Sequence, residues 1–278
     1  MSPKAKKVIL AILIAILVLA AAFWIYLSFY SKADETALAA MESSGSVTVT
    51  ATDYGWFFDG LSEDTALVFY PGAKVEAKAY APLLRLLAES GTDVCLAEMP
   101  ARMAMYGINK ADKIMAEYTY DNWFVGGHSL GGWASEKYAS DHEDRLRGVV
   151  IFAARPRNVL TLPELVLCGS EDSIVQPDKY FFADSESSDD APGSAKGRSQ
   201  TEFGNHGLQS GGGTVTIALG PNVTAEIIEG GNHAQFGSYG LQTGDGTATI
   251  SAEAQREEAV RLALNWIKEH SPSMAAAA

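Results

Sequence analysis

The stretch Trp123-Phe124-Val125-Gly126-Gly127-His128-Ser129-Leu130-Gly131-Gly132 decides the fold. Its bulky apolar start is typical of the end of a buried strand, and the residues that follow Gly132 are typical of a helix. The pattern Gly127-x-Ser129-x-Gly131 therefore stands where a strand turns sharply into a helix. Only glycine at the two flanking positions avoids a backbone collision in so tight a turn. The turn would lift the Ser129 hydroxyl clear of the sheet, beside the unpaired N–H groups that begin a helix, which suits a nucleophile. The alternative is an ordinary glycine-rich turn with a surface serine.

Strand-like and helix-like segments alternate along the rest of the chain. Continuous apolar runs predict strands covered on both faces, at 66–70, 93–97, 148–153, 164–168 and 225–229. Apolar residues at helical spacing predict helices at 80–90, 110–117 and 252–269. Two opening antiparallel strands are expected at 47–52 and 56–58. This rhythm predicts an α/β fold with a mainly parallel central sheet and helices on both faces.

The N-terminal segment is predicted to be a membrane anchor. Val8 to Tyr30 carries no charge and follows Lys4, Lys6 and Lys7, and such a run is long enough to cross a bilayer. Phe23 to Tyr30 adds aromatic residues suited to the far interface. A cleavable signal peptide ending near Ala20-Ala21-Ala22 is the alternative. With the anchor retained, the lysines predict a single-pass protein with a cytoplasmic N-terminus and the rest outside.

These patterns divide the chain into an anchor at 1–31, a linker at 32–46 and a domain at 47–271. Residues 184–213 lack apolar periodicity and are predicted to be an exposed, flexible insertion. The net charge is −13, and residues 1–32 contain lysines but no acid, so the remainder is more acidic still. Such a charge disfavours nucleic-acid binding. The two cysteines, Cys95 and Cys168, are expected as buried free thiols on distant strands.

A serine nucleophile needs a base that is itself oriented by an acid. Of the five histidines, His233 directly follows the last predicted strand, where ligands gather in such sheets. His128 should point away from the nucleophile, and the remaining three are expected to be idle or structural. Asp172 and Glu171 both follow a strand end and qualify as the acid, and Asp172 is our choice. The order Ser, Asp, His is the one associated with the α/β-hydrolase architecture.

The sequence resembles the α/β-hydrolase superfamily and, within it, the small α/β-hydrolase family 5 subgroup, over about residues 47–270. The resemblance is carried by the motifs at 70–75, 127–132, 169–172 and 230–237, and continues through Tyr239, Gly244-Asp245-Gly246 and Thr249-Ile250-Ser251. It implies the α/β-hydrolase fold. Since only Arg155 to Pro163 separates two strands where relatives often build a cap, no large cap is expected.

The resemblance also implies residue roles. Ser129 would be the nucleophile, His233 the general base and then acid, and Asp172 its orienting partner. The N–H groups of Leu130 and Ala73 would form the oxyanion hole. Lys74 and Gln235 are two further candidates, for binding the substrate; a solvated loop lysine is the alternative for Lys74.

The sequence thus predicts a membrane-anchored serine hydrolase that cleaves an ester or related acyl bond in a small-molecule substrate, through an acyl-enzyme. A peptidase or acyltransferase could use the same triad, and a non-catalytic ligand-binding module could retain the scaffold. No cofactor and no metal site are expected, because the histidines are scattered and neither H-x-x-x-H nor C-x-x-C occurs. Oligomeric state and protein partners leave no pattern in the sequence.

Overall fold

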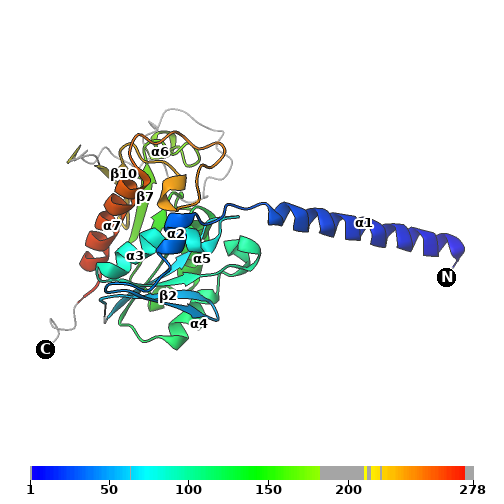
Figure 1. The fold of residues 1–278 in the computed structure, drawn as a ribbon, viewed down its shortest axis with the longest axis horizontal. Coiled ribbons are helices and arrows are strands. Elements are labelled where there is room, and N and C mark those ends of the chain that lie inside the picture. Colours follow the sequence, from blue (N-terminus) through cyan, green and yellow to red (C-terminus); the bar gives the residue numbers. More distant parts are fainter. Residues whose placement is uncertain (1, 63, 182–209, 212–213, 220, 273–278) are drawn as a thin grey trace.

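The computed structural model describes residues 2–62, 64–181, 210–211, 214–219 and 221–272. At its centre is a ten-stranded sheet in the order β1-β2-β4-β3-β5-β6-β7-β10-β9-β8 (Figure 1). The strands are β1 (Thr48–Thr52), β2 (Gly55–Asp59), β3 (Thr65–Tyr70), β4 (Asp93–Ala97), β5 (Asn122–His128), β6 (Gly148–Phe152), β7 (Glu164–Gly169), β8 (Ser210–Gly211), β9 (Thr214–Ala218) and β10 (Val223–Ile228).

The middle of the sheet is parallel, as the continuous apolar runs predict. Neighbouring strands from β4 through β10 run parallel, whereas β1, β2, β8 and β9 add antiparallel pairs at the edges. Every residue of β3 to β7 is buried. Because the central strands are parallel, their carboxyl ends meet at one edge of the sheet, where the loops that carry the candidate site lie.

Helices cover both faces of the sheet. The helices of the described residues are α1 (Pro3–Ser28), which lies apart from the sheet, α2 (Glu35–Ala39), α3 (Ala81–Glu89), α4 (Lys110–Glu117), α5 (Leu130–Asp141), α6 (Pro177–Phe181) and α7 (Ala252–Glu269), with short 3-10 turns η1 (Ala77–Tyr80), η2 (Pro100–Arg102), η3 (Ala104–Tyr106), η4 (Glu143–Arg145) and η6 (Ala234–Phe236). On β6, a Cβ at Gly148 would meet Trp266 of α7 at 2.5 Å, whereas Ile151 lies 2.8 Å from the Cβ position of Gly132 in α5. Residues three apart on a strand point to opposite faces, so α5 and α7 lie on opposite sides of the sheet.

Helix α1 projects away from the rest of the chain (Figure 1). It is long and apolar enough to cross a membrane, with a mean hydropathy of 3.2. Its one buried residue is Leu27, in the last turn. Among the described residues, the helix therefore packs against the remainder of the chain only at its carboxyl end.

The segment at 32–46 is not a free stalk. Asp34 caps the short helix α2 by accepting a hydrogen bond from the Ala37 N–H (2.9 Å), and Ala37 is completely buried. The Asp34 carboxylate also accepts a hydrogen bond from the Ser238 hydroxyl at 2.9 Å. The composition of this segment is small and polar, but small residues can pack closely, and its acid Asp34 has a partner far along the chain.

Strand β9, which lies next to the edge strand β8, is absent from the sequence-based prediction, in which the sheet resumes only at Ala225. Thr214 to Ala218 alternates polar and apolar residues and pairs antiparallel with β10. Of the predicted insertion at 184–213, residues 184–209 and 212–213 lie outside the described residues, while Ser210–Gly211 pairs with β9 as β8. The connection from β6 to β7 at 153–163 contains no helix, in agreement with the expected lack of a cap there.

The two cysteines are free and buried, as predicted. Cys95 lies on β4 and Cys168 on β7, with β3, β5 and β6 between these strands. Four strand spacings of about 4.8 Å separate them by roughly 19 Å, far beyond disulfide reach.

Candidate active site

The turn at Ser129 has the strained geometry expected from its glycines. Strand β5 ends at His128 and α5 begins at Leu130, so Ser129 alone makes the turn, with φ 53° and ψ −119°. A Cβ at Gly127 or Gly131 would meet the Tyr70 carbonyl oxygen at 2.5 Å or 1.9 Å. Non-glycine residues rarely adopt this backbone conformation, and the surrounding structure must hold it. Here the Ser129 N–H donates to the Phe152 carbonyl at 2.9 Å.

Asp172, not Glu171, contacts the histidine. One carboxylate oxygen of Asp172 accepts hydrogen bonds from the backbone N–H groups of Ile174 (2.9 Å) and Val175 (2.8 Å). The other lies 2.9 Å from Nδ1 of His233, and both side chains are buried. The two backbone donors fix the carboxylate, which in turn favours the tautomer with the proton on Nδ1. His233 Nε2 is then left as an acceptor.

The loop that carries His233 is held from two sides. Asp245 accepts hydrogen bonds from the N–H groups of His233 (3.2 Å) and Ala234 (2.9 Å). The Gln255 side chain, on α7, accepts from the Asn232 N–H at 2.9 Å and donates to the Asn232 carbonyl at 2.7 Å. The position of the imidazole is therefore set by contacts outside the triad.

The base nitrogen is buried and has no hydrogen-bond partner in the described part of the chain. The hydroxyl of Ser129 is thus not hydrogen-bonded to it. The two groups nevertheless share one edge of the sheet, because the His233 ring lies 4.6 Å, centre to centre, from the ring of His128, the neighbour of Ser129. Catalytic hydrogen bonds are often long without substrate and tighten when it binds.

A chain of buried polar contacts connects the two loops beside Ser129. The Gly72 N–H donates to the Tyr80 hydroxyl (3.1 Å), which lies 2.8 Å from His128 Nδ1. His128 Nε2 lies 2.9 Å from the His233 carbonyl oxygen. One arrangement satisfies every group: Tyr80 donates to Nδ1, and a neutral His128 donates from Nε2. Burial, together with the nearby His233, lowers the pKa of His128 well below its usual value, which keeps the ring neutral.

The sequence did not predict a role for Tyr80 and His128 in this chain. In the sequence, Tyr80 is one of the apolar positions of a predicted helix, and His128 is expected only to point away from the nucleophile. The available signal was the residue type, because a tyrosine hydroxyl in a buried position needs a partner. Burial raises the pKa of Tyr80 well above its usual value, so its hydroxyl remains protonated and can donate.

The candidate oxyanion donors belong to the residue that follows Ser129 and to the loop that follows β3. Leu130 is the first residue of α5, where backbone N–H groups have no partner within the helix. Ala73 is exposed, and its neighbours are fixed: Gly72 donates to Tyr80, and the Lys74 N–H donates to the Arg102 carbonyl (2.9 Å). Among the described residues, neither Ala73 nor Leu130 donates its N–H to another protein group.

The two candidate substrate-binding side chains make contacts within the protein. The Lys74 ammonium lies 3.8 Å from the centre of the Tyr26 ring of α1. The Gln235 amide donates to the Ile250 carbonyl at 3.3 Å. Of the other histidines, His142 and His270 each contact a backbone carbonyl one helical turn away, and His206 lies outside the described residues.

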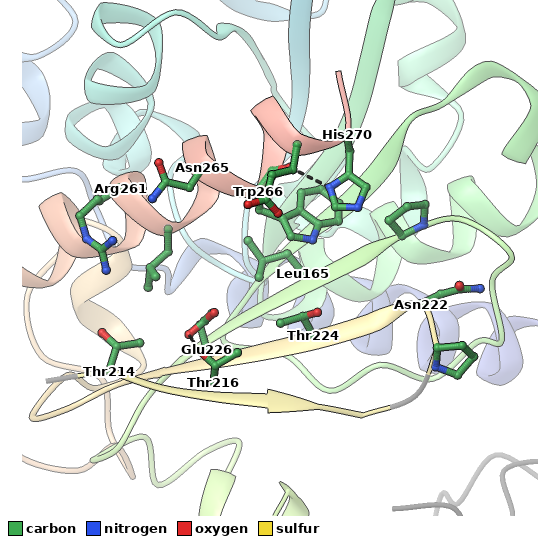
Figure 2. A pocket seen from close by; sticks show the side chains of 14 residues that line it. Leu165, Thr214, Thr216, Asn222, Thr224, Glu226, Arg261, Asn265, Trp266 and His270 are labelled. Carbon is green, nitrogen blue, oxygen red and sulfur yellow. Dashed lines mark hydrogen bonds between the residues drawn. The ribbon is translucent and has the colours of Figure 1, made fainter. Parts of the chain in front are cut away.

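A cavity of about 950 Å³ lies elsewhere, between α7 and strands β7, β9 and β10 (Figure 2). Its lining includes Glu226, Arg261 and Trp266 and none of Ser129, Asp172 or His233. Within the described residues, no cluster of three or more His, Cys, Asp or Glu could hold a metal ion. The acid–base pair and the strained serine therefore lie outside this cavity.

Comparison with known proteins agrees with this architecture. The sequence model of the "Alpha/beta hydrolase family" matches residues 66–220 and 217–257. The chain belongs to the alpha/beta hydrolase family. No curated protein matches this alpha/beta hydrolase.

Solved structures show the same fold at low sequence identity. An alpha/beta hydrolase enzyme from the metagenome of Mar Chica lagoon sediments is 14% identical with a TM-score of 0.50, over 82% of this chain and 97% of that one. A predicted CIB-like hydrolase from Thermoplasma acidophilum is 11% identical with a TM-score of 0.50, over 80% of this chain and 99% of that one. These similarities support the fold of this alpha/beta hydrolase, and hydrolase activity follows from the family.

Proposed function

We propose that this alpha/beta hydrolase is a membrane-anchored serine hydrolase that cleaves an ester or related acyl bond. The observation that carries the proposal is the buried pair of Asp172 and His233, 2.9 Å apart, at the sheet edge where the strained Ser129 also stands. A carboxylate fixed by backbone donors, an imidazole with a free nitrogen and a serine in a tight turn are the parts that acyl transfer requires.

In the proposed reaction, His233 Nε2 takes the hydroxyl proton as Ser129 Oγ attacks the acyl carbon. The carbonyl oxygen becomes an oxyanion, which the N–H groups of Leu130 and Ala73 would bind. His233 then gives its proton to the leaving oxygen as the acyl–oxygen bond breaks, leaving an acyl-enzyme. Water attacks this ester in the second half, with His233 again as the base, and releases the acid and free Ser129. Asp172 stabilises the imidazolium in both halves.

The anchor in this proposal is α1. Its apolar length, its lack of burial except at Leu27 and the lysines before it support insertion with the N-terminus in the cytoplasm. The hydrolase would then work on the far side of the membrane. Residues 47–271 would form the catalytic domain.

The test is the full-length protein with Ser129→Ala, assayed with a soluble 4-nitrophenyl ester and a fluorophosphonate probe. We expect loss of turnover and labelling, while Ser140→Ala, half-buried near the far end of α5, keeps both. Hydrolysis retained in Ser129→Ala would refute the nucleophile assignment. A folded wild-type chain that takes no label would instead support a ligand-binding module, and amide and acyl-acceptor substrates separate a peptidase or acyltransferase from an esterase.

A further inference from the structure

The segment that leaves α1 contacts both loops of the candidate active site. Ser31 pairs with Val75: its N–H donates to the Lys74 carbonyl (2.8 Å), and its carbonyl accepts from the Glu76 N–H (2.9 Å). Ser31 is thereby attached to the loop that carries Ala73. Three residues later, the Asp34 N–H donates to the Ser238 carbonyl at 3.0 Å, in the chain that follows His233.

Aromatic and basic side chains reinforce this attachment. The Lys74 ammonium lies over the ring of Tyr26, and the Arg102 guanidinium lies 3.5 Å from the centre of the Tyr30 ring. Cations over aromatic faces attract, and both residue types favour the interface between membrane and water. Helix α1 is therefore held to the catalytic edge of the sheet rather than joined to it by a flexible tether.

The length of α1 sets the height of this edge above a bilayer. Roughly 20 helical residues cross the hydrocarbon core, and Val8 to Leu27 supplies them. Ser31 then lies within a few residues of the hydrocarbon boundary, at the level of the lipid headgroups. Because Ser31 is bonded to the residues around Val75, the oxyanion loop lies at the same level.

Exposed apolar side chains stand on the loops of this same edge. We call Phe29, Met105, Tyr106, Ile174 and Leu241 the apolar rim; they are 68%, 41%, 56%, 40% and 96% exposed. Ile174 donates its N–H to Asp172, and Leu241 lies in the loop whose Asp245 holds His233. Met105 and Tyr106 follow Arg102, whose carbonyl is bonded to Lys74. Apolar groups gathered beside a membrane helix would be stabilised by insertion into the lipid surface.

The geometry points to a fatty-acyl ester of a membrane lipid as the substrate, presented to Ser129 from the bilayer surface through the apolar rim. This inference rests on the proposed function. Ester carbonyls of glycerolipids lie between the headgroups and the acyl chains, which is the level that α1 assigns to the oxyanion loop. Among the described residues, the connection between β6 and β7 places no helical cap over this edge.

The experiment uses the full-length chain in phosphatidylcholine vesicles that contain dioleoylglycerol, with oleate release measured beside hydrolysis of soluble 4-nitrophenyl acetate. We expect Leu241→Ser to lower oleate release roughly tenfold, because the variant loses one leucine side chain that the lipid surface would bury. Hydrolysis of the soluble ester should not change. The matched control is Leu61→Ser, because Leu61 is 61% exposed but precedes β3, at the opposite edge of the sheet. It should leave both activities unchanged.

The outcomes separate the two proposals. Soluble-ester hydrolysis with no oleate release, or an equal loss in Leu241→Ser and Leu61→Ser, would overturn the lipid substrate while the serine hydrolase stands. If the folded wild type hydrolyses neither substrate and takes no fluorophosphonate label, both proposals fail.

Discussion

Replacing Tyr80 with phenylalanine tests whether the buried polar chain beside Ser129 positions the active site. The substitution keeps the aromatic ring, which packs 5.1 Å from Phe69 and 5.4 Å from His128, and removes only the hydroxyl. The Gly72 N–H and His128 Nδ1 both lose their partner. Tyr80 and His128 are almost completely buried, so water cannot replace the lost contacts without opening the structure.

The expected cost follows from these two contacts. Each buried polar group left without a partner costs about 1–3 kcal/mol, and two such groups are left, so we expect Tyr80→Phe to lower the free energy of unfolding by about 2–6 kcal/mol. A typical domain is stable by about 5–15 kcal/mol, so the variant should still fold. Gly72 precedes Ala73, the candidate oxyanion donor, and its release should lower kcat more than it raises KM. Complete loss of such a donor costs about 10²–10³-fold in kcat, which sets the upper limit.

Denaturant unfolding and steady-state kinetics on a soluble ester measure these effects. The control is Tyr239→Phe, because among the described residues the Tyr239 hydroxyl bonds only to the Gln242 side chain (3.1 Å), and its removal should cost about 1 kcal/mol or less. The pH dependence of kcat is expected to keep its shape, since neither tyrosine is the base. If Tyr80→Phe is as stable and as active as Tyr239→Phe, the buried chain does not position the site.

Two further predictions concern the acid and the buried histidine. Asp172→Asn should keep the two backbone hydrogen bonds but present an amide to His233 Nδ1, which favours the wrong tautomer and lowers kcat roughly 10⁴-fold; kcat within tenfold of wild type would contradict the role of Asp172. Because the pKa of His128 is lowered in the native protein, the unfolded chain takes up a proton near pH 6.5 while the native ring does not. The free energy of unfolding should therefore fall as the pH drops below about 6.5, by up to about 1.4 kcal/mol per pH unit. Unfolding measured between about pH 7 and pH 5 should show this slope in wild type and a smaller one in His128→Gln; equal slopes would count against a neutral, buried His128.

The sequence alone predicted those features that depend on local pattern. Continuous apolar runs identified the parallel strands, because strands buried on both faces have no polar side. The glycines around Ser129 identified the tight turn, and in the structure a Cβ at Gly127 or Gly131 would meet the Tyr70 carbonyl oxygen at the end of β3. Asp172 and His233 were predicted from their places after strand ends, where a parallel sheet brings separate loops together.

The features that the sequence did not predict depend on contacts between distant segments. Asp34 and Ser238 are 204 positions apart, and nothing in the composition of residues 32–46 indicates that they meet. The hydrogen-bonded link from Gly72 through Tyr80 to His128 joins three separate segments, and nothing in the sequence distinguishes these residues from others in the core. Strand β9 was overlooked because its short alternating pattern stands beside a segment with no periodicity.

The short segment from Ser31 to Asp34 connects α1 to the loop that carries Ala73 and, through Ser238, to the polar chain that contains Tyr80. Asp34 bonds to Ser238, whose N–H donates to the Ala79 carbonyl at 2.7 Å, next to the hydroxyl-bearing Tyr80. Ser31 meanwhile holds the residues just after Ala73. A soluble fragment that begins at Ala33 would keep the first contact and lose the second, so its oxyanion loop would be less restrained than in the full chain. Activity measured on such a fragment would therefore combine loss of the membrane with loss of positioning, and the full-length protein in vesicles is needed to separate the two.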